Sequence, residues 1–307
     1  MTAMIASPYA DDLARIPVRE HRALVHGSDT AWWEYGDPGA PTIVMVHGFR
    51  GDHHGLEPIV AKLQGYRLIV PDLPGFGASS TFAAGAHDID GYAAWLAEFV
   101  GVCGASDAAA AGGSDGFALL GHSFGSIITA AAVAAGLAPR ELVLVNPIGA
   151  PALEGPRAIM TRLAVGYYRA AAALPEKLGF ALLRNRVIVR VMSVTMAKTE
   201  EPALRRFIHD QHDRYFSAFG DRDAVLEAFE ASVSHDVREY APSIAVPVLL
   251  VVAEQDDVTP LAAQRRLQPL FDDATLAVIP GVGHLIHYET PAEAAGHIRV
   301  FLEGERP

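Results

Sequence analysis

Short apolar runs alternate along the chain with longer helical or connecting stretches. Ala23–Val25 and Ala31–Tyr35 predict an antiparallel pair of strands joined through residues 27–29. Further β-branched or leucine-rich runs predict the remaining strands, at Thr42–Val46, Arg67–Val70, Phe117–Leu120, Glu141–Val145, Val246–Val252 and Thr275–Ile279. Apolar strands that alternate with helices are typical of a mainly parallel sheet covered on both faces. The pattern therefore predicts an α/β fold with a central sheet flanked by helices.

The alternation stops between Pro147 and about Pro242. Helical patterns fill this region, at Ile159–Ala173, Leu178–Ala197, Glu200–Phe219 and Arg222–Val233. We therefore expect a core made of residues 1–148 and 243–307, with residues 149–242 inserted as a helical cap, or lid. Ligands bind beyond the carboxyl ends of the strands in such sheets, so the cap should lie over a binding site.

Composition narrows the possible partners. A formal net charge of −12 over 307 residues argues against nucleic acid, because phosphate binding requires clustered Lys and Arg. The N-terminal residues show no signal-peptide pattern, and no 18-residue apolar run occurs. We expect a cytoplasmic protein with a small-molecule substrate and no membrane partner. The single Cys103 cannot form an internal disulfide and is interpreted as a buried apolar residue.

The stretch around Ser123 carries the strongest chemical signal. An apolar run leads into Gly121-His122-Ser123-Phe124-Gly125, and a helical segment of small residues follows. A G-x-S-x-G motif between a strand and a helix forms a nucleophile elbow, a sharp turn that exposes the serine hydroxyl. Ser123 is therefore the predicted nucleophile.

A serine hydroxyl needs a base at neutral pH. His284 lies in a glycine-rich loop after the last predicted strand and is the preferred candidate. The acid that orients the imidazole should follow the preceding strand, where Asp256 is preferred and Asp257 is its competitor. Asn146, after an earlier strand, is a neutral amide and cannot supply that charge.

The loop after the strand Thr42–Val46 should lie beside the elbow. We expect the backbone N–H groups of Phe49 and Phe124 to form an oxyanion hole. His47, Gly48 and His122 are candidate substrate-binding residues. This chemistry requires no metal and no cofactor.

The chain resembles the α/β-hydrolase superfamily over nearly its whole length. The resemblance rests on VMVHGF at 44–49, VPDLPGFGAS at 70–79, GHSFG at 121–125, AEQDDVTP at 253–260 and IPGVGHLIHYETPAE at 279–293. It implies the capped α/β-hydrolase fold and a Ser-His-Asp triad that cleaves a carboxylic ester through an acyl-enzyme. C–C bond hydrolysis, cofactor-free haloperoxidase or perhydrolase activity, and ligand reception with slow turnover are alternatives within the same fold. Asp72 is interpreted as a residue that organises a turn.

Several further side chains receive structural interpretations. His53 and His54 are expected in an exposed turn, and His209 and His212 on the solvated face of a helix. His287 is expected to pack or to form structural hydrogen bonds. An aromatic stripe should pack the inserted region together, and arginines 184, 186 and 190 are interpreted as helix-surface residues.

Overall fold

The computed structural model describes residues 5–106, 116–150 and 158–304. The stretch 105–116, whose Ala/Gly/Ser/Asp-rich composition predicts a surface loop, lies for the most part outside these residues. In the described parts of the chain, no helix combines the length and the apolar composition needed to cross a membrane.

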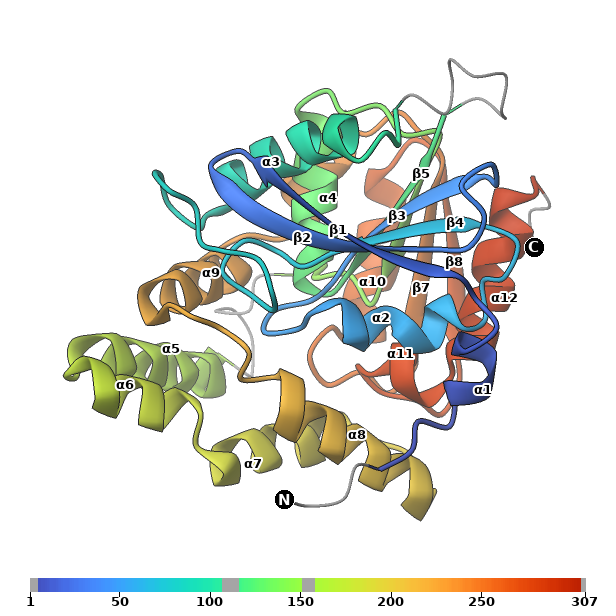
Figure 1. Ribbon diagram of the computed structural model, residues 1–307. Coiled ribbons are helices and arrows are strands. Elements are labelled where there is room, and N and C mark those ends of the chain that lie inside the picture. Colours follow the sequence, from blue (N-terminus) through green and yellow to red (C-terminus); the bar gives the residue numbers. More distant parts are fainter. Residues whose placement is uncertain (1–4, 107–115, 151–157, 305–307) are drawn as a thin grey trace.

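An eight-stranded sheet in the order β1-β2-β4-β3-β5-β6-β7-β8 forms the centre of the molecule (Figure 1). The strands are β1 (Val18–Val25), β2 (Ser28–Tyr35), β3 (Thr42–Val46), β4 (Arg67–Pro71), β5 (Ala118–His122), β6 (Glu141–Val145), β7 (Val248–Ala253) and β8 (Ala274–Ile279). β2 pairs antiparallel with β1 and β4, and every other pairing is parallel. The predicted mainly parallel sheet is therefore confirmed.

The first two strands are longer than predicted. The expected link through residues 27–29 shortens to His26 and Gly27, both with positive φ (46° and 77°). Two positive φ angles are typical of the tight hairpin turn whose twist matches that of paired strands. The turn therefore allows pairing from Val25 with Ser28 onward.

Alternate residues of each central strand enter two different cores. In β3, Val44 and Val46 pack with the helices α3 (Ile89–Val102) and α4 (Phe124–Ala134). Ile43 and Met45 pack on the other face, with α2 (His53–Val60) and α12 (Pro291–Leu302). Because side chains alternate across a strand, an uninterrupted apolar run is buried on both faces. This explains why these strands could be predicted from apolar runs.

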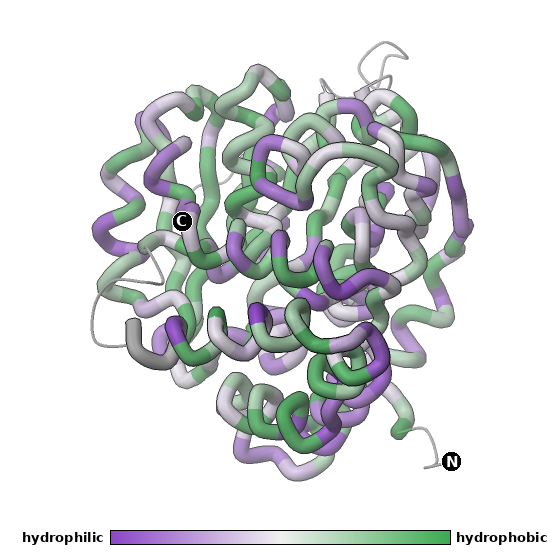
Figure 2. Tube along the Cα trace, turned by 90° about the vertical axis from the view of Figure 1, so that its left-hand side faces the viewer, coloured by the Kyte–Doolittle hydropathy of each residue, from purple (hydrophilic) through white to green (hydrophobic). Residues whose placement is uncertain are grey.

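The remaining helices belong to two groups. Helices α1 (Ala10–Leu13), α10 (Leu261–Leu267) and α11 (Ile286–Glu289) accompany the sheet, together with short 3₁₀ turns at Val237–Glu239, Ala241–Ser243 and Gln268–Leu270. Between β6 and β7 lie α5 (Ala158–Ala173), α6 (Glu176–Leu183), α7 (Arg186–Met196), α8 (Pro202–Tyr215) and α9 (Arg222–Ser234). Figure 1 shows α5 to α9 gathered on one side of the molecule. Along the outer helices, Figure 2 shows hydrophobic and hydrophilic residues in alternation.

The helix predicted at Leu178–Ala197 is two helices. Asn185 begins the second one, because its side-chain oxygen accepts hydrogen bonds from the N–H groups of Val187 and Ile188. Such an N-cap satisfies backbone donors that have no partner within the helix. The helix predicted to reach Phe219 ends at Tyr215.

Candidate active site

Ser123 lies at the turn between β5 and α4, with φ 52° and ψ −116°. The turn is crowded by neighbouring backbone. A Cβ atom at Gly121 would lie 2.5 Å from the Gly125 carbonyl oxygen, and one at Gly125 would lie 2.4 Å from the Val46 carbonyl oxygen. Contacts this close exclude any side chain at either glycine. The two glycines of the motif therefore let the strand, the turn and the helix approach one another, and the turn holds Ser123 in a strained conformation.

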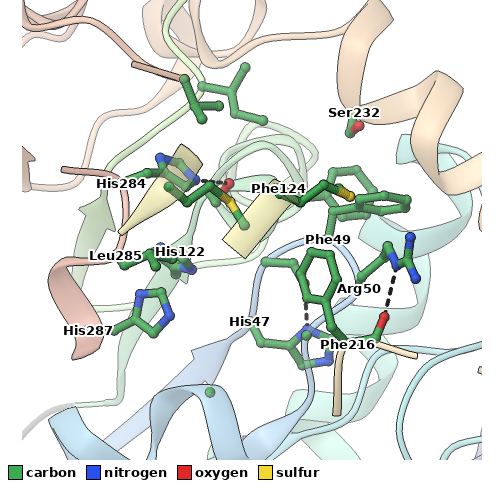
Figure 3. Close-up of a pocket in the computed structure, with 18 of the residues that line it drawn as sticks. His47, Phe49, Arg50, His122, Phe124, Phe216, Ser232, His284, Leu285 and His287 are labelled. Atoms are coloured by element: carbon green, nitrogen blue, oxygen red, sulfur yellow. Dashed lines mark hydrogen bonds between the residues drawn. The ribbon is translucent and has the colours of Figure 1, made fainter. Parts of the chain in front are cut away.

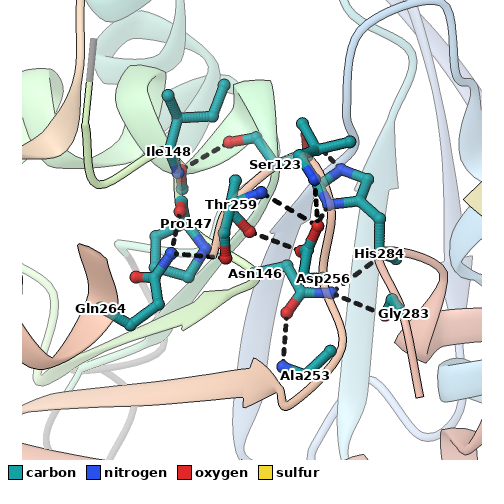
Figure 4. A network of polar contacts seen from close by, with 12 residues as sticks. Ser123, Asn146, Pro147, Ile148, Ala253, Asp256, Thr259, Gln264, Gly283 and His284 are labelled. Carbon is teal, nitrogen blue, oxygen red and sulfur yellow. Dashed lines mark hydrogen bonds and ion pairs between the residues drawn. The ribbon is translucent and has the colours of Figure 1, made fainter. Parts of the chain in front are cut away.

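His284 and Asp256 lie beside Ser123 (Figure 4). His284 Nε2 is 2.9 Å from Ser123 Oγ, and His284 Nδ1 is 2.7 Å from Asp256 Oδ2. With Nδ1–H donating to the carboxylate, Nε2 is left to accept the serine proton. Asp257, the competing acid, is instead exposed and pairs with Lys198. The structure therefore brings together the three residues predicted as a triad.

Asp256 is held as a buried carboxylate. Burial acts to raise its pKa, but the charge and hydrogen bond of His284 and the hydrogen bonds of Thr259 outweigh this effect and lower the pKa to about 2. Its oxygens also accept from the backbone N–H groups of Val258 and Thr259. Hydrogen bonds to the charged form stabilise that form. Asp256 is therefore ionised near neutral pH.

Asn146 supports the histidine loop, a role that the sequence analysis missed. Its side-chain N–H groups donate to the carbonyl oxygens of His284 (2.9 Å) and Gly283 (3.4 Å). Its side-chain oxygen accepts from Ala253 N, at the end of β7. Asn146 itself has φ 43°, a left-handed conformation that Asn adopts more readily than most residues. This amide therefore links the strand before Asp256 to the loop that carries His284.

The loop after β3 lies against the elbow. A Cβ atom at Gly48 would lie 3.2 Å from the Cβ of Ser123. Among the residues that the structure describes, no hydrogen-bond acceptor is found for the backbone N–H of Phe49 or Phe124. Phe124 begins α4, so its N–H belongs to the set of helix N-terminal donors that lack a partner within the helix. Both groups can therefore donate to a bound oxyanion.

His47, Gly48 and His122 border the same cavity as Ser123. Both ring nitrogens of His47 already have backbone partners, since Nδ1 donates to Gly48 O and Nε2 accepts from Leu73 N. His47 therefore anchors the loop, and its contact with substrate stays a prediction. His122 Nε2 is buried and has no partner within the described residues.

The cavity has a volume of about 1220 Å³ and extends from the elbow to the helices α5, α7, α8 and α9 (Figure 3). Most of its wall is apolar. The apolar side chains come from both the sheet side and the inserted helices, and they include Phe49, Leu56, Phe124, Ile148, Met192, Met196, Phe216, Phe229, Val233, Val258 and Leu285. Polar side chains of both parts also line it, among them Gln211, Arg238 and Arg266. A mainly apolar cavity that carries some polar groups is typical of a small-molecule site.

His53 and His54 do not lie in the exposed turn that the sequence predicted. His53 is buried, its Nδ1 bonds to Asp72, and its ring stacks on Trp33. His54 is half-buried; its Nδ1 lies 3.2 Å from an Asp52 carboxylate oxygen. The prediction of an exposed turn was wrong, because both residues lie in the first turn of α2, which Asp52 caps, and the His54 ring stacks on Tyr215. Asp72 accepts from His53 N and Ala78 N, so its role in organising a turn is borne out.

The three groups Asp52, His53 and His54 could bring one ligand atom each to within 4.8 Å of one another, as metal ligands would. The hydrogen bonds and stacking just described already account for their arrangement.

His209 and His212 are also buried, against the expectation of a solvated face. Both Nδ1 atoms bond to the hydroxyl of Ser193, a buried residue of α7. A helix pattern shows which residues share a face, but the partner helix decides which face is covered. Here α7 covers the face of α8 that carries the two histidines.

We predict that acid weakens the fold through its buried histidines. Burial is the main cause that lowers the pKa of His122 and of His212 to about 3, and it also lowers the pKa of His287 well below its ordinary value. An unfolded chain binds protons at these groups near pH 6.5 whereas the folded chain does not, so the free energy of unfolding should fall as pH decreases. From about pH 7 to 5, His122 and His212 should each lower the free energy of unfolding by about 2 kcal/mol.

Urea unfolding at the two pH values measures this loss. In His287→Gln the loss should be smaller than in the wild type, because one buried imidazole no longer binds a proton on unfolding. The control is His26→Asn in the exposed hairpin turn, which leaves the buried histidines in place. An unchanged loss in His287→Gln would contradict the prediction.

The only cysteine, Cys103, is buried as expected, and burial raises the pKa of its thiol to about 11. His287 is buried against His122, with ring centroids 4.2 Å apart, as its packing interpretation predicted.

Comparisons with known proteins agree with the fold. Residues 43–297 match the model of the alpha/beta hydrolase family. The chain is 26% identical over 262 residues to a 2-succinyl-6-hydroxy-2,4-cyclohexadiene-1-carboxylate synthase of Salmonella typhimurium, covering 84% of this chain and 92% of the relative. It is 23% identical over 288 residues to Lipase 3 of a Moraxella species, covering 92% and 83%.

A thermophilic esterase from Thermogutta terrifontis has a similar structure, with a TM-score of 0.71 at 21% identity, covering 94% of this chain and all of the esterase chain. The two relatives and the esterase structure each align with most of this chain. The family model matches the part of the chain from β3 to α12. The chain belongs to the alpha/beta hydrolase family.

Proposed function

We propose that this protein is a serine hydrolase that cleaves the carboxylic ester of a small molecule through an acyl-enzyme. The observation that carries the proposal is the hydrogen-bonded chain from Ser123 Oγ through His284 to Asp256 at the wall of a large apolar cavity. The similarity to Lipase 3 supports ester cleavage within the family. Helices α5 to α9, within residues 149–242, are proposed as the cap that closes the cavity.

In the first half of the reaction, Ser123 Oγ attacks the ester carbonyl carbon and His284 Nε2 takes the hydroxyl proton. General base catalysis of this kind contributes roughly 10²–10⁴-fold. Asp256 stabilises the imidazolium that forms. The backbone N–H groups of Phe49 and Phe124 donate to the oxyanion of the tetrahedral intermediate, and each such donor is worth about 3–4 kcal/mol.

Collapse of this intermediate breaks the bond to the alcohol oxygen, which leaves with the proton from His284. Water then attacks the acyl carbon while His284 Nε2 takes a proton from the water. The second intermediate collapses, which breaks the bond from the acyl carbon to Ser123 Oγ and releases the acid, and His284 returns the proton to Ser123 Oγ. Because the cavity wall is mainly apolar, we expect an acyl or alcohol group of considerable apolar surface.

A panel of p-nitrophenyl acetate, butyrate, octanoate and laurate, with matching thioesters, tests this proposal. We expect saturable hydrolysis, with kcat/KM rising from acetate toward a longer acyl chain. A fluorophosphonate should inactivate the enzyme, and mass spectrometry should find the adduct on the peptide that contains Ser123.

Absence of turnover on the whole panel would contradict the proposal. Labelled Ser123 without turnover would favour another reaction of the same nucleophile, such as C–C bond hydrolysis, which a vinylogous diketone would reveal. Saturable ligand binding without turnover would favour a receptor.

A further inference from the structure

Arg50 directly follows Phe49 in the loop after β3, which we call the oxyanion loop. The residue is almost fully buried, with 1% of its surface exposed. Its backbone has φ 59°, the left-handed conformation that non-glycine residues adopt at a cost. A buried cation and a strained backbone are both unfavourable unless surrounding contacts compensate for them. The contacts of the Arg50 side chain must therefore compensate for its burial and its backbone strain.

Those contacts all lie in the inserted helices. Arg50 Nε donates to Phe216 O (2.9 Å), Nη2 donates to Leu183 O (2.8 Å), and Nη1 lies 3.3 Å from the Tyr168 hydroxyl. Figure 3 shows the bond from Arg50 to Phe216 at the cavity wall. The guanidinium also lies 4.8 Å from the centre of the Phe216 ring. One side chain of the oxyanion loop thus contacts α5, the end of α6 and the end of α8.

Two of the acceptors are carbonyl groups at helix ends. Leu183 is the last residue of α6, and Phe216 is the C-cap of α8. Carbonyl groups in the last turn lack donors within the helix and lie at the negative end of the helix dipole. A cation that donates to two such ends compensates for its own burial and fixes the two helices relative to each other.

We propose that Arg50 is a positioning residue that holds the Phe49 N–H in place by fastening the oxyanion loop to the inserted helices. This inference rests on the proposed function, because it assigns Phe49 the oxyanion. Arg50 touches no reacting atom and acts through its neighbour. The position of the helices thereby sets the geometry of the oxyanion hole, so that a displaced cap weakens the chemical step as well as substrate binding.

The test compares Arg50→Met with a matched arginine. Arg184 also donates to a carbonyl group of the inserted region, that of Phe219, and packs on the Phe180 and Phe219 rings, so Arg184→Met is the control. The main measurement is the phosphonylation of Ser123 by a methyl and by a long-chain alkyl fluorophosphonate. Oγ bonds to phosphorus, fluoride leaves and His284 takes the proton, so the reaction uses the oxyanion hole and needs no ester substrate.

In Arg50→Met we expect the maximal labelling rate to fall by the same factor for both reagents, about 10–100-fold, less than complete loss of one oxyanion donor causes. The fluorophosphonate concentration that gives half the maximal labelling rate should change little. The kcat values for the acetate and octanoate esters should fall by similar factors. Arg184→Met should label at the wild-type rate.

A wild-type labelling rate with the methyl reagent in folded Arg50→Met would overturn the proposal, as would an equal loss in Arg184→Met. If Arg50→Met does not fold, the same comparison is made with Arg50→Lys, which retains the charge but not the three-way contact. Labelling without ester turnover in the wild type would refute the proposed function, while the comparison of labelling rates would still decide the role of Arg50.

Discussion

Replacing Ser123 by alanine is expected to lower kcat for ester hydrolysis by about 10⁶-fold, as loss of the nucleophile does in a serine protease. Without Oγ no acyl-enzyme forms, and His284 has no hydroxyl to deprotonate. The fold should be unaffected, because the hydroxyl bonds to the His284 side chain and not to the backbone that forms the turn. Alanine also carries the same Cβ at the strained turn. Steady-state kinetics on the preferred ester measures the loss, and circular dichroism verifies the fold.

The matched control is Ser126→Ala, three residues further along the chain and within α4. The Ser126 hydroxyl donates to Ser123 O and accepts from Ile148 N, so it supports the turn without facing His284. We expect its removal to lower stability by about 1 kcal/mol and to leave most of the activity. If Ser123→Ala retained activity comparable to that of Ser126→Ala, the nucleophile would lie elsewhere.

The parts of the site that could be predicted are those fixed by local sequence. Gly121 and Gly125 are required by backbone contacts within a few residues of the turn or with the adjacent strand. The strands were recognisable because burial on both faces removes polar residues from them. Since parallel strands end at the same edge, the elbow and the loops that follow β7 and β8 could be expected to meet there.

The parts that were missed depend on partners distant in sequence. Asn146 was considered only as a possible acid, yet its amide bonds to the His284 loop more than a hundred residues away. Arg50 has an ordinary sequence context, and only the packing of α6 and α8 shows what it contacts. His209 and His212 follow the same rule, because Ser193 belongs to another helix. A single sequence contains no signal for such pairings.

Replacing Asp256 by asparagine is expected to lower kcat by about 10⁴-fold, the loss seen when the acid of a comparable triad becomes an amide. Asp256 accepts from two backbone N–H groups, the Thr259 hydroxyl and His284 Nδ1. An amide must present N–H₂ in place of one of these oxygens. Facing His284, that group would make Nδ1 an acceptor and put the proton on Nε2, which then cannot take the proton of Ser123.

Asp257→Asn is the control for this change, because it removes a neighbouring carboxylate that pairs with Lys198 at the surface. It should retain activity within several-fold of the wild type, whereas Asp256→Asn should lose it across the whole pH range in which the enzyme works. With a pKa of about 2, Asp256 is charged throughout that range in the wild type, so its loss should lower activity at every pH in the range. Equal losses in the two variants would assign the orienting charge to another group.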